Sequence, residues 1–314
     1  MSKNHFVGLD CGASKILFQK ASYNLDLDLV IPFGNSIEVL YSNNKDWIKN
    51  FSPVPIQNQL KQFSKNSIVL TPEEESQGGV IIEEIEKLLA LTDQNNSSIC
   101  FPGLKSDEGV CIMVNGPRIP FFNKLLNLHQ HILNDSDCCT IGEWKSSIGC
   151  MIDIENAIYI GGGTGIADGM IMNGEIINFN EHTNLKRSWE IGFNDSTIES
   201  QISPGGMIKT FNTKFNRNIK NLDEFIESKE SLTILKNASE ALSYLIENRI
   251  NFFRLNDLEP ELVVIGQRLG LLLSGLKKEI QEMFYQSSKV PLKFSIDRRT
   301  AALGAIYKMI KYQK

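Results

Sequence analysis

Short apolar runs alternate along the chain with segments whose apolar residues recur at helical spacing. Residues 5–22 predict a strand, a tight glycine turn and a second strand. Residues 37–42, 98–102, 109–114, 157–160 and 261–265 predict further short strands. Residues 169–178 predict a hairpin, because Asn173-Gly174 is a strong signal for a two-residue turn.

Helical segments follow these strands in both halves. Thr71, Pro72 and Glu74 predict a capped helix start, since threonine caps, proline suits the first turn and glutamate completes a capping box. Residues 121–129, 231–253 and 303–310 also predict helices. Strands that alternate with helices indicate an α/β fold. Each half repeats a strand–glycine turn–strand unit, which suggests two lobes with a cleft between them.

Composition and charge narrow the class of protein. The chain has 314 residues, 42% of them hydrophobic and 22% charged, as in ordinary globular proteins. A net charge of −5 argues against a protein that binds nucleic acid through its phosphates. The longest apolar run, residues 269–276, is too short to cross a membrane, and residues 1–5 do not start a secretory segment. We therefore expect a cytoplasmic location.

Cysteine and histidine give no sign of a metal site. The 6 cysteines form no C-x-x-C pair, and in the cytoplasm we expect them to be reduced and mostly buried. His129 and His131 lie two residues apart, but no cluster of ligand spacing joins them.

The first candidate site is the turn at residues 10–15, Asp-Cys-Gly-Ala-Ser-Lys. Backbone N–H groups, Ser14 and Lys15 of such a turn can bind a phosphate, while Asp10 holds Mg²⁺ through water. A plain β-hairpin turn is the alternative interpretation.

The second candidate is the glycine-rich segment at residues 161–169. Its glycines allow a sharp turn or a close approach to a ligand, and Thr164 offers a hydroxyl to a phosphate. No Gly-Lys-Ser/Thr follows, so this is not a P-loop. A glycine-rich hairpin is the alternative.

The third candidate is Asn134-Asp135-Ser136-Asp137, with Glu143 farther along. An ionised aspartate above a helix start can accept a proton from a substrate hydroxyl. The alternative is a set of N-capping residues before a helix.

Together these motifs resemble the ROK sugar kinases of the actin-like ATPase superfamily. The family's phosphate turns D-x-G-G-T-K and G-T-G-I-G-x-G-x-x-x-x-G appear as DCGASK and GTGIADGMIMNG. Its catalytic loop N-D-x-N-x-x-x-x-x-E appears as NDSDCCTIGE, and its E-I-G-H as EIGF. The segments IESQISPGG, VVIGQRLG and TAALGAIYKMI resemble later family motifs. The motifs occur in family order and cover most of residues 5–312.

The resemblance implies a fold and a division of the chain. The fold would be α/β, with two actin-like (ribonuclease H-like) lobes and a ligand cleft between them. The N-terminal lobe would span residues 1–134, with an unusual insertion at about 22–68. The C-terminal lobe would span residues 135–314, with a last helix at 298–314 that packs back on the N-terminal lobe.

The resemblance also implies a role for each matching residue. Asp135 would be the general base, and Asp10 would organise Mg²⁺. The residues implied to bind Mg-ATP are Asp10, Gly12, Ser14, Lys15, Gly163, Thr164, Gly165 and, at the adenosine end, Gly266. Those implied to hold the sugar are Gly103, Asn115, Asn134, Asp135, Glu190 and Glu199.

Several positions depart from the family pattern. Phe193 stands where the family has a zinc-binding histidine, and the family's cysteine loop is missing, so we expect no structural zinc. Phe193 would stack on a less polar sugar face or fill the space of the missing loop. Ala13 and Gln267 replace common glycines, and the Ala13 methyl would crowd the γ-phosphate or be tolerated.

The implied activity is an ATP-dependent sugar kinase that transfers the γ-phosphate of Mg-ATP to a hydroxyl of a hexose or hexosamine. The alternative is a non-catalytic sugar or nucleotide sensor without a DNA-binding domain, since the phosphate turn begins at residue 10. An actin-like polymer protein is a third class, which Glu190 and Glu199 argue against. The expected partners are sugar and ATP, with no nucleic acid and no membrane, and the family expectation is a homodimer.

Overall fold

The computed structural model describes residues 5–126, 132–182 and 184–312. The chain forms two compact units, Met1–Ser147 with Arg299–Lys314, and Ile148–Arg298. The first unit extends past the division that we expected after residue 134, because α4 (Asp135–Lys145) packs with this unit. The C-terminal helix α11 (Thr300–Tyr312) also belongs to it.

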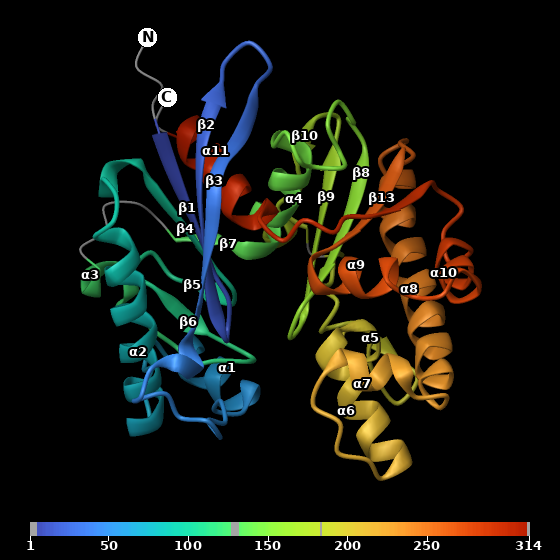
Figure 1. The fold of residues 1–314 in the computed structure, drawn as a ribbon, viewed down its shortest axis with the longest axis horizontal. Helices are drawn as coiled ribbons and strands as arrows, with labels where there is room; N and C mark the ends of the chain where they lie inside the picture. Colours follow the sequence, from blue (N-terminus) through green and yellow to red (C-terminus); the bar gives the residue numbers. More distant parts are fainter. Residues whose placement is uncertain (1–4, 127–131, 183, 313–314) are drawn as a thin grey trace. The chain divides into compact units, whose positions relative to one another are not determined.

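The first unit contains a five-stranded sheet in the order β3-β2-β1-β4-β7 (Figure 1). Its strands are β1 (His5–Cys11), β2 (Lys15–Asn24), β3 (Leu29–Leu40), β4 (Ser97–Phe101) and β7 (Leu133–Asn134). The pairs β1–β2 and β2–β3 are antiparallel, whereas β1–β4 and β4–β7 are parallel. The predicted strand–turn–strand at residues 5–22 is therefore confirmed.

Other short elements complete this unit. They are α1 (Ile56–Ser64), α2 (Pro72–Leu89), β5 (Leu104–Lys105), β6 (Val110–Ile112), α3 (Phe122–Leu125) and the 3₁₀ turns Tyr41–Asn43 and Gln94–Asn96. The predicted capping box is confirmed: the Glu74 N–H donates to the Thr71 hydroxyl at 3.1 Å, and the Thr71 N–H donates to the Glu74 carboxylate at 3.1 Å. The helix predicted at 121–129 is present as α3, and residues 127–129 lie outside the described ranges.

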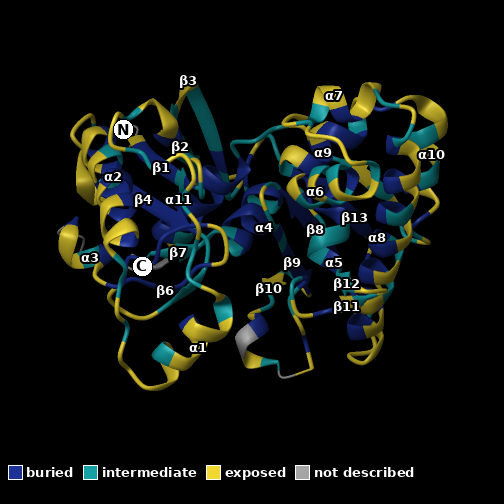
Figure 2. Ribbon diagram, turned by 90° about the horizontal axis from the view of Figure 1, so that it is seen from below, coloured by how far each residue is buried: buried dark blue, intermediate teal, exposed yellow. Residues whose placement is uncertain are grey.

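Two helices cover opposite faces of this sheet. Side chains alternate along a strand, so Val7 and Leu9 point to one face and Gly8 to the other. Val7 and Leu9 belong to the core that includes Ile81 and Ile85 of α2. On the other face, a Cβ added to Gly8 would lie 2.0 Å from the Ala302 carbonyl oxygen of α11. Figure 2 shows the inner strands as buried.

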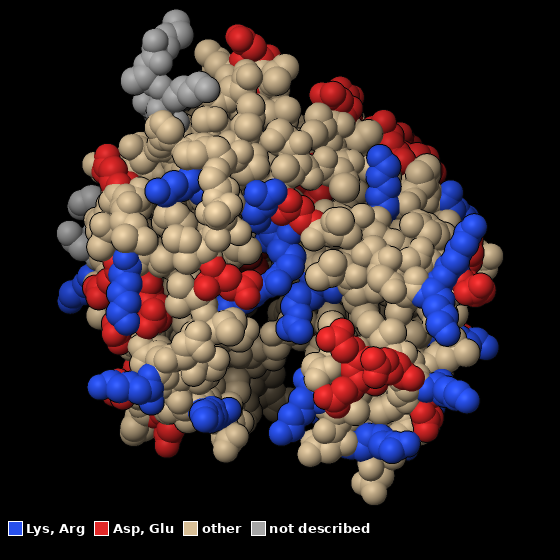
Figure 3. Space-filling model, viewed as in Figure 1, with Lys and Arg blue, Asp and Glu red and all other residues tan. Residues whose placement is uncertain are grey.

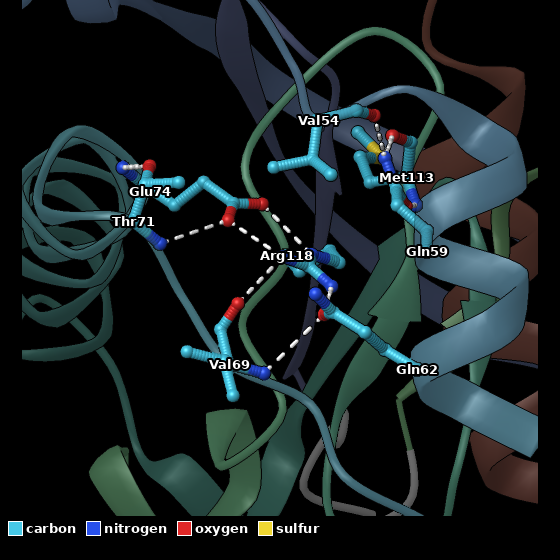
Figure 4. A network of polar contacts seen from close by, with 8 residues as sticks. All are labelled: Val54, Gln59, Gln62, Val69, Thr71, Glu74, Met113 and Arg118. Atoms are coloured by element: carbon cyan, nitrogen blue, oxygen red, sulfur yellow. Dashed lines mark hydrogen bonds and ion pairs between the residues drawn. The ribbon is translucent and has the colours of Figure 1, made fainter. Parts of the chain in front are cut away.

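A buried ion pair holds the segment that precedes α2 in place (Figure 4). The Arg118 guanidinium donates to both Glu74 carboxylate oxygens, at 2.8 and 2.7 Å, and both side chains are fully buried. It also donates to the Gln62 side chain at 2.6 Å and the Val69 carbonyl at 3.0 Å. Arg118 thus joins α1, the chain around Val69 and α2, all within or beside the segment expected to be an insertion.

The second unit repeats the same strand arrangement, in the order β10-β9-β8-β13-β14. Its sheet consists of β8 (Ala157–Gly162), β9 (Ile166–Met172), β10 (Glu175–Ile176), β13 (Leu262–Gly266) and β14 (Leu292–Phe294). The pairs β8–β9 and β9–β10 are antiparallel, whereas β8–β13 and β13–β14 are parallel. The predicted hairpin is confirmed, with Asn173 and Gly174 both at positive φ.

Helices cover this second sheet, and α8 contributes most of their buried face. The elements are α5 (Ile198–Ile202), α6 (Pro204–Phe215), α7 (Leu222–Glu227), α8 (Ser231–Arg254), α9 (Gln267–Ser274), α10 (Lys278–Tyr285), the small hairpin β11 (Gly192–Phe193) and β12 (Ser196–Thr197), and the 3₁₀ turn Phe179–Glu181. Leu242 and Leu245 of α8 share one core with Ile158 and Val263 of the sheet. The helix predicted at residues 231–253 is thereby confirmed.

Three general features follow from the described residues. No helix among them combines the length and the apolar character that crossing a bilayer requires. Cys11, Cys100, Cys111, Cys138 and Cys139 are buried thiols, and Cys150 is partly exposed. Acidic and basic side chains are interspersed on the face drawn in Figure 3.

The buried Arg118–Glu74 pair yields a stability prediction. Replacing Arg118 with methionine leaves the Glu74 carboxylate buried without its cation, which costs about 3–5 kcal/mol. We expect Arg118→Met to lower the free energy of unfolding by that amount in urea denaturation. Arg254→Met is the control, because Arg254 pairs with Glu247 and Glu259 at the surface and should change stability by less than about 1 kcal/mol. Equal effects of the two variants would contradict the prediction.

Candidate functional site

The turn between β1 and β2 is closed by backbone hydrogen bonds. The Gly12 N–H donates to the Lys15 carbonyl at 2.8 Å, and the Tyr41 N–H donates to the Ser14 carbonyl at 3.1 Å. Ser14 is exposed on this turn. Asp10, the penultimate residue of β1, lies beside Cys100 of β4, whose thiol lies 3.8 Å from the Asp10 carboxylate. The turn therefore presents Asp10, Gly12 and Ser14 at the carboxyl end of β1.

Lys15, which we expected to bind phosphate, has an acidic partner. Its ammonium forms an ion pair with the carboxylate of Glu38 on β3. Ile16, next to Lys15, pairs with Val39, next to Glu38, in the β2–β3 ladder. The Lys15–Glu38 ion pair therefore joins β2 to β3 beside the turn. A phosphate at this turn must compete with Glu38 for Lys15.

Asp135 is the first residue of α4, at the carboxyl end of β7. Asn134 caps the helix, because its side-chain oxygen accepts from the Ser136 N–H at 3.0 Å and the Asp137 N–H at 3.4 Å. The Asp135 carboxylate accepts from the Ser136 N–H at 2.9 Å and is half-buried. Burial raises its pKa, and the Lys105 ammonium opposes that increase most. The N-cap of the alternative interpretation is thus present on Asn134, and it leaves the neighbouring Asp135 carboxylate outside the cap.

Gly103 and Lys105 lie next to this helix start. Strands β4 and β7 run parallel, with Phe101 opposite Asn134. The chain after Phe101 and the start of α4 therefore leave the sheet at the same end, where both strands have their carboxyl ends. Gly103 has φ of +89°, and a Cβ there would lie 2.3 Å from the Ile112 carbonyl. Its carbonyl accepts from the Lys105 ammonium at 2.8 Å. Lys105 was not predicted from the sequence, where its only signal is its place two residues after Gly103.

Asn115 stands on an exposed turn between two anchored neighbours. Gln59 of α1 donates to the Met113 carbonyl at 2.8 Å and accepts from the Met113 N–H at 2.8 Å. On the other side, Arg118 is held by its ion pair. A Cβ on Gly116 would lie 3.9 Å from the Ala13 methyl, so this turn adjoins the turn between β1 and β2.

The glycine-rich turn of the second unit joins β8 to β9. The Gly163 N–H donates to the Gly165 carbonyl at 2.9 Å, and Thr164 is exposed between them. Gly205, in the first turn of α6, packs beside it: a Cβ there would lie 3.4 Å from the Thr164 carbonyl oxygen. The start of α6 was missed from the sequence, although Pro204 in its first turn is a helix-start signal.

Glu199 and the segment around Glu190 adjoin the same turn. The Glu199 carboxylate accepts from the Ile166 N–H at 2.9 Å, and the Ser188 hydroxyl lies 3.4 Å from the Ile166 carbonyl. Burial raises the pKa of Glu199. Glu190 is exposed, and its carboxylate accepts from the Arg187 N–H at 2.9 Å. The second unit thus brings Glu199, the Glu190 segment and the glycine-rich turn together.

A buried ion pair stabilises this arrangement. The Arg249 guanidinium on α8 contacts the Asp168 carboxylate on β9 at 2.6 and 2.8 Å, and it donates to the Lys186 carbonyl at 2.7 Å. Asp168 was part of the glycine-rich motif but had no predicted role. The pair links the strand after the turn to the chain that leads to Glu190.

Gly266 and Gln267 form the junction between β13 and α9. A Cβ on Gly266 would lie 2.7 Å from the Tyr159 ring, so the position requires glycine. Gln267 has φ of +57°, in the region that favours glycine, which explains why a glycine is common there.

The hairpin β11–β12 lies between the Glu190 segment and Glu199. Phe193 at its end packs against Tyr244 of α8, with ring centroids 5.7 Å apart. This contact favours the space-filling interpretation of Phe193. Within the described ranges, no group of three His, Cys, Asp or Glu residues is arranged to hold a metal ion, and His129 and His131 lie outside those ranges. A magnesium ion that arrives with ATP takes most ligands from phosphate and water, so Asp10 suits it as a single carboxylate.

Comparison with known proteins identifies the fold. No protein-family profile and no curated protein sequence matches the chain. Among solved structures, a ROK hexokinase from Thermus thermophilus matches with a TM-score of 0.61 and 14% identity over 99% of each chain. A ROK family glucokinase from Streptomyces griseus, in complex with glucose and AMPPNP, matches with a TM-score of 0.57 and 12% identity over 96% of this chain and 98% of its own. A ROK family transcriptional regulator matches with a TM-score of 0.62 and 14% identity over 98% of this chain and 78% of its own. The predicted α/β fold of the ROK sugar kinases is therefore confirmed.

The Lys15–Glu38 pair generates a prediction about nucleotide binding. Glu38→Gln removes the acid that competes for the lysine, so Mg-AMPPNP should bind roughly 2- to 5-fold more tightly, as expected for a partly exposed pair. Isothermal titration calorimetry measures the dissociation constant. Glu83→Gln, which removes an exposed partner of Lys87, is the control and should leave binding unchanged. Unaltered or weaker binding by Glu38→Gln would show that Lys15 does not contact phosphate.

Proposed function

We propose that this chain, which has the fold of the ROK sugar kinases, transfers the γ-phosphate of Mg-ATP to a hydroxyl of a hexose or hexosamine. The observation that carries the proposal is Asp135, a half-buried carboxylate at the carboxyl end of a parallel strand. Ligands of open α/β sheets bind at such strand ends. The glucokinase and hexokinase with this fold support the same reaction class.

Asp135 acts as the general base. One carboxylate oxygen is held by the Ser136 N–H, which fixes the side chain at the helix start. The sugar hydroxyl passes its proton to the carboxylate as its oxygen forms a bond with the γ-phosphorus. The bond between that phosphorus and the β–γ bridging oxygen breaks, and ADP leaves with the bonding electrons. Positioned bases of this kind contribute about 10²–10⁴-fold to rate.

The two glycine turns bind the phosphates. In the first unit, the Ser14 N–H and hydroxyl would contact the ligand, with Lys15 beside them, and Gly12, whose N–H donates to the Lys15 carbonyl, would shape the turn. In the second unit, Thr164 and Gly165 would contact the phosphates, Gly163 would close the turn through its bond to the Gly165 carbonyl, and Gly266 would approach the adenosine. Asp10 would hold magnesium through water when ATP is bound, and the ion would supply positive charge against the phosphates.

Polar side chains around Asp135 and Glu199 hold the sugar. Asn134, Gly103 and Asn115 serve in the first unit, and Glu190 and Glu199 in the second. Glu199 already accepts one N–H from Ile166, which orients its carboxylate for paired hydroxyls. Amide and carboxylate groups match vicinal hydroxyls, which supports a neutral hexose or an N-acetyl hexosamine as acceptor.

A second candidate function is a sugar or nucleotide sensor that does not turn over. The Lys15–Glu38 ion pair favours it, because a lysine neutralised by a carboxylate contributes less to phosphate transfer. A transcriptional regulator also shares the fold. Ligand binding without ADP formation distinguishes the sensor from the kinase.

The kinase proposal is tested by ADP release from Mg-ATP with glucose, mannose, fructose and N-acetylglucosamine. We expect release to depend on one class of sugar and to fall by about 10²–10⁴-fold in Asp135→Asn, which cannot accept the proton. Asp137→Asn is the matched control in the same helical turn, where Asp137 pairs with Lys308 at 3.2 Å, and it should retain activity within about 10-fold.

The outcomes separate the two candidates. Sugar-dependent release that persists in Asp135→Asn would overturn the assigned base. Sugar binding by wild type without any ADP would support the sensor.

The raised pKa of Asp135 predicts the pH profile. The base works only when ionised, so kcat/KM should fall as pH decreases through its pKa. Since burial raises that pKa, the acid limb should lie at a higher pH than for an exposed aspartate, whose pKa is about 3.9. Initial rates from about pH 4 to 8 at saturating Mg-ATP measure it. An acid limb at or below the ordinary aspartate value would contradict the prediction.

A further inference from the structure

Lys105 is a charged side chain that the proposed mechanism does not use. It lies on β5, which pairs with β6 through Leu104 and Lys105, just beyond the carboxyl end of β4. Asp135 lies just beyond the carboxyl end of β7, the parallel neighbour of β4. The chain that leaves β4 and the chain that leaves β7 therefore carry an ammonium and a carboxylate beyond the same end of the sheet.

The two charges lie near each other without forming an ion pair. Lys105 is half-buried, and within the described part of the chain its ammonium makes a single hydrogen bond, to the Gly103 carbonyl at 2.8 Å. Asp135 similarly makes one hydrogen bond there, from the Ser136 N–H. An ammonium has three donors, so the remaining Lys105 donors and the second Asp135 oxygen have no protein partner among these residues.

Lys105 and Asp135 are the opposite charges that most affect each other's pKa. Burial lowers the pKa of Lys105, and Asp135 is the largest influence that raises it. Burial raises the pKa of Asp135, and Lys105 is the largest influence that lowers it. Asp137 also faces Asp135 but is paired with Lys308, while the Cys100 and Cys138 thiols lie near Lys105.

Half-burial of a lysine without an anionic contact is costly, because long basic side chains otherwise extend their ammonium into water. The hydrogen bond from the Lys105 ammonium to the Gly103 carbonyl fixes the Lys105 side chain beside its own backbone. Gly103 itself is fixed by its positive φ and its close approach to Ile112. The lysine is therefore held in place by backbone geometry rather than by the carboxylate.

We propose that Lys105 binds the acceptor sugar, with its ammonium donating to a sugar oxygen next to the hydroxyl that Asp135 deprotonates. This inference rests on the proposed kinase function. The sugar hydroxyl beside Asp135 donates to the carboxylate, and a neighbouring sugar oxygen accepts from the Lys105 ammonium. The two protein charges therefore match two adjacent sugar oxygens. Lys105 keeps its own proton throughout, and the transferred proton ends on Asp135.

The same placement gives Lys105 an effect on the base. Its positive charge opposes the increase in the Asp135 pKa that burial causes, so it keeps more of the base ionised at neutral pH. Losing the ammonium should thus weaken sugar binding and also move the acid limb of the pH profile upward. A residue that only supports the fold would do neither.

The experiment compares wild type with Lys105→Met and Lys105→Arg in the ADP-release assay with the same four sugars. We expect Lys105→Met to raise the sugar KM at least about 10-fold, with the ATP KM changed less than about 2-fold, as for losing a charge-assisted hydrogen bond. Its acid limb should shift to higher pH. Lys105→Arg, which keeps the charge, should restore the pH profile and part of the sugar affinity.

Controls separate the possible failures. Lys124→Met, an exposed lysine on α3, should leave both KM values unchanged. Calorimetric titration of each sugar without ATP measures binding independently of turnover. If Lys105→Met folds and is active but keeps the wild-type sugar KM and pH profile, the role of Lys105 is overturned and the kinase proposal stands.

Loss of sugar binding in Lys105→Met, with a wild type that binds sugar but releases no ADP, would support the role of Lys105 and overturn the kinase. A wild type that neither binds nor phosphorylates any of the four sugars would overturn both proposals. If Lys105→Met does not fold, as judged by thermal unfolding, Lys105→Gln replaces it.

Discussion

The close packing of α11 against α4 and β1 determines where the proposed base lies. A Cβ on Gly142 of α4 would lie 1.8 Å from the Thr300 carbonyl, and one on Gly304 of α11 would lie 1.9 Å from the Cys138 carbonyl. The two helices touch through their backbones, so neither can shift without the other. Because Asp135 is the first residue of α4, the C-terminal helix fixes the base although it follows 165 residues later in the chain. Gly8 of β1 brings the Asp10 strand into the same contact.

The hairpin β2–β3 is attached to this helix pair through one carboxylate. Asp28 accepts hydrogen bonds from Tyr23, Tyr307, Lys145 and Lys311, at 2.6 to 3.0 Å. Burial raises the pKa of Asp28, but these donors, Lys311 first, outweigh it and hold the pKa well below its usual range. Lys145 belongs to α4, and Tyr307 and Lys311 belong to α11, so part of the predicted insertion supports the helix that carries the proposed base. The rest supports the turn that carries Asn115, because Gln59 donates to the Met113 carbonyl and Gln62 accepts from Arg118.

Local sequence signals predicted the elements whose causes are local. The Thr71 capping box, the Asn173-Gly174 hairpin and the apolar face of α8 need only neighbouring residues, and all three are present. The missed features depend on residues distant in the sequence. Lys105 lies near Asp135 only because β4 and β7 are adjacent in the sheet. Helix α1 was missed because it buries Gln59 and exposes Leu60, so the spacing of its apolar residues did not predict its buried face. The motifs of the site were visible in order, but the ion pair that occupies Lys15 was not, since Glu38 lies on the next strand.

The departures from the family pattern have explanations inside the unit where each occurs. The Ala13 methyl packs against the core of the first unit and adjoins Gly116, so the added carbon contacts protein. Phe193 packs on Tyr244 and against the core of the second unit. Gln267 adopts the backbone conformation that a glycine would have. Each substitution is thus compensated by packing or backbone geometry nearby. The Lys15–Glu38 ion pair differs in kind from these three positions, because it acts through charge and occupies the lysine of the β1–β2 turn.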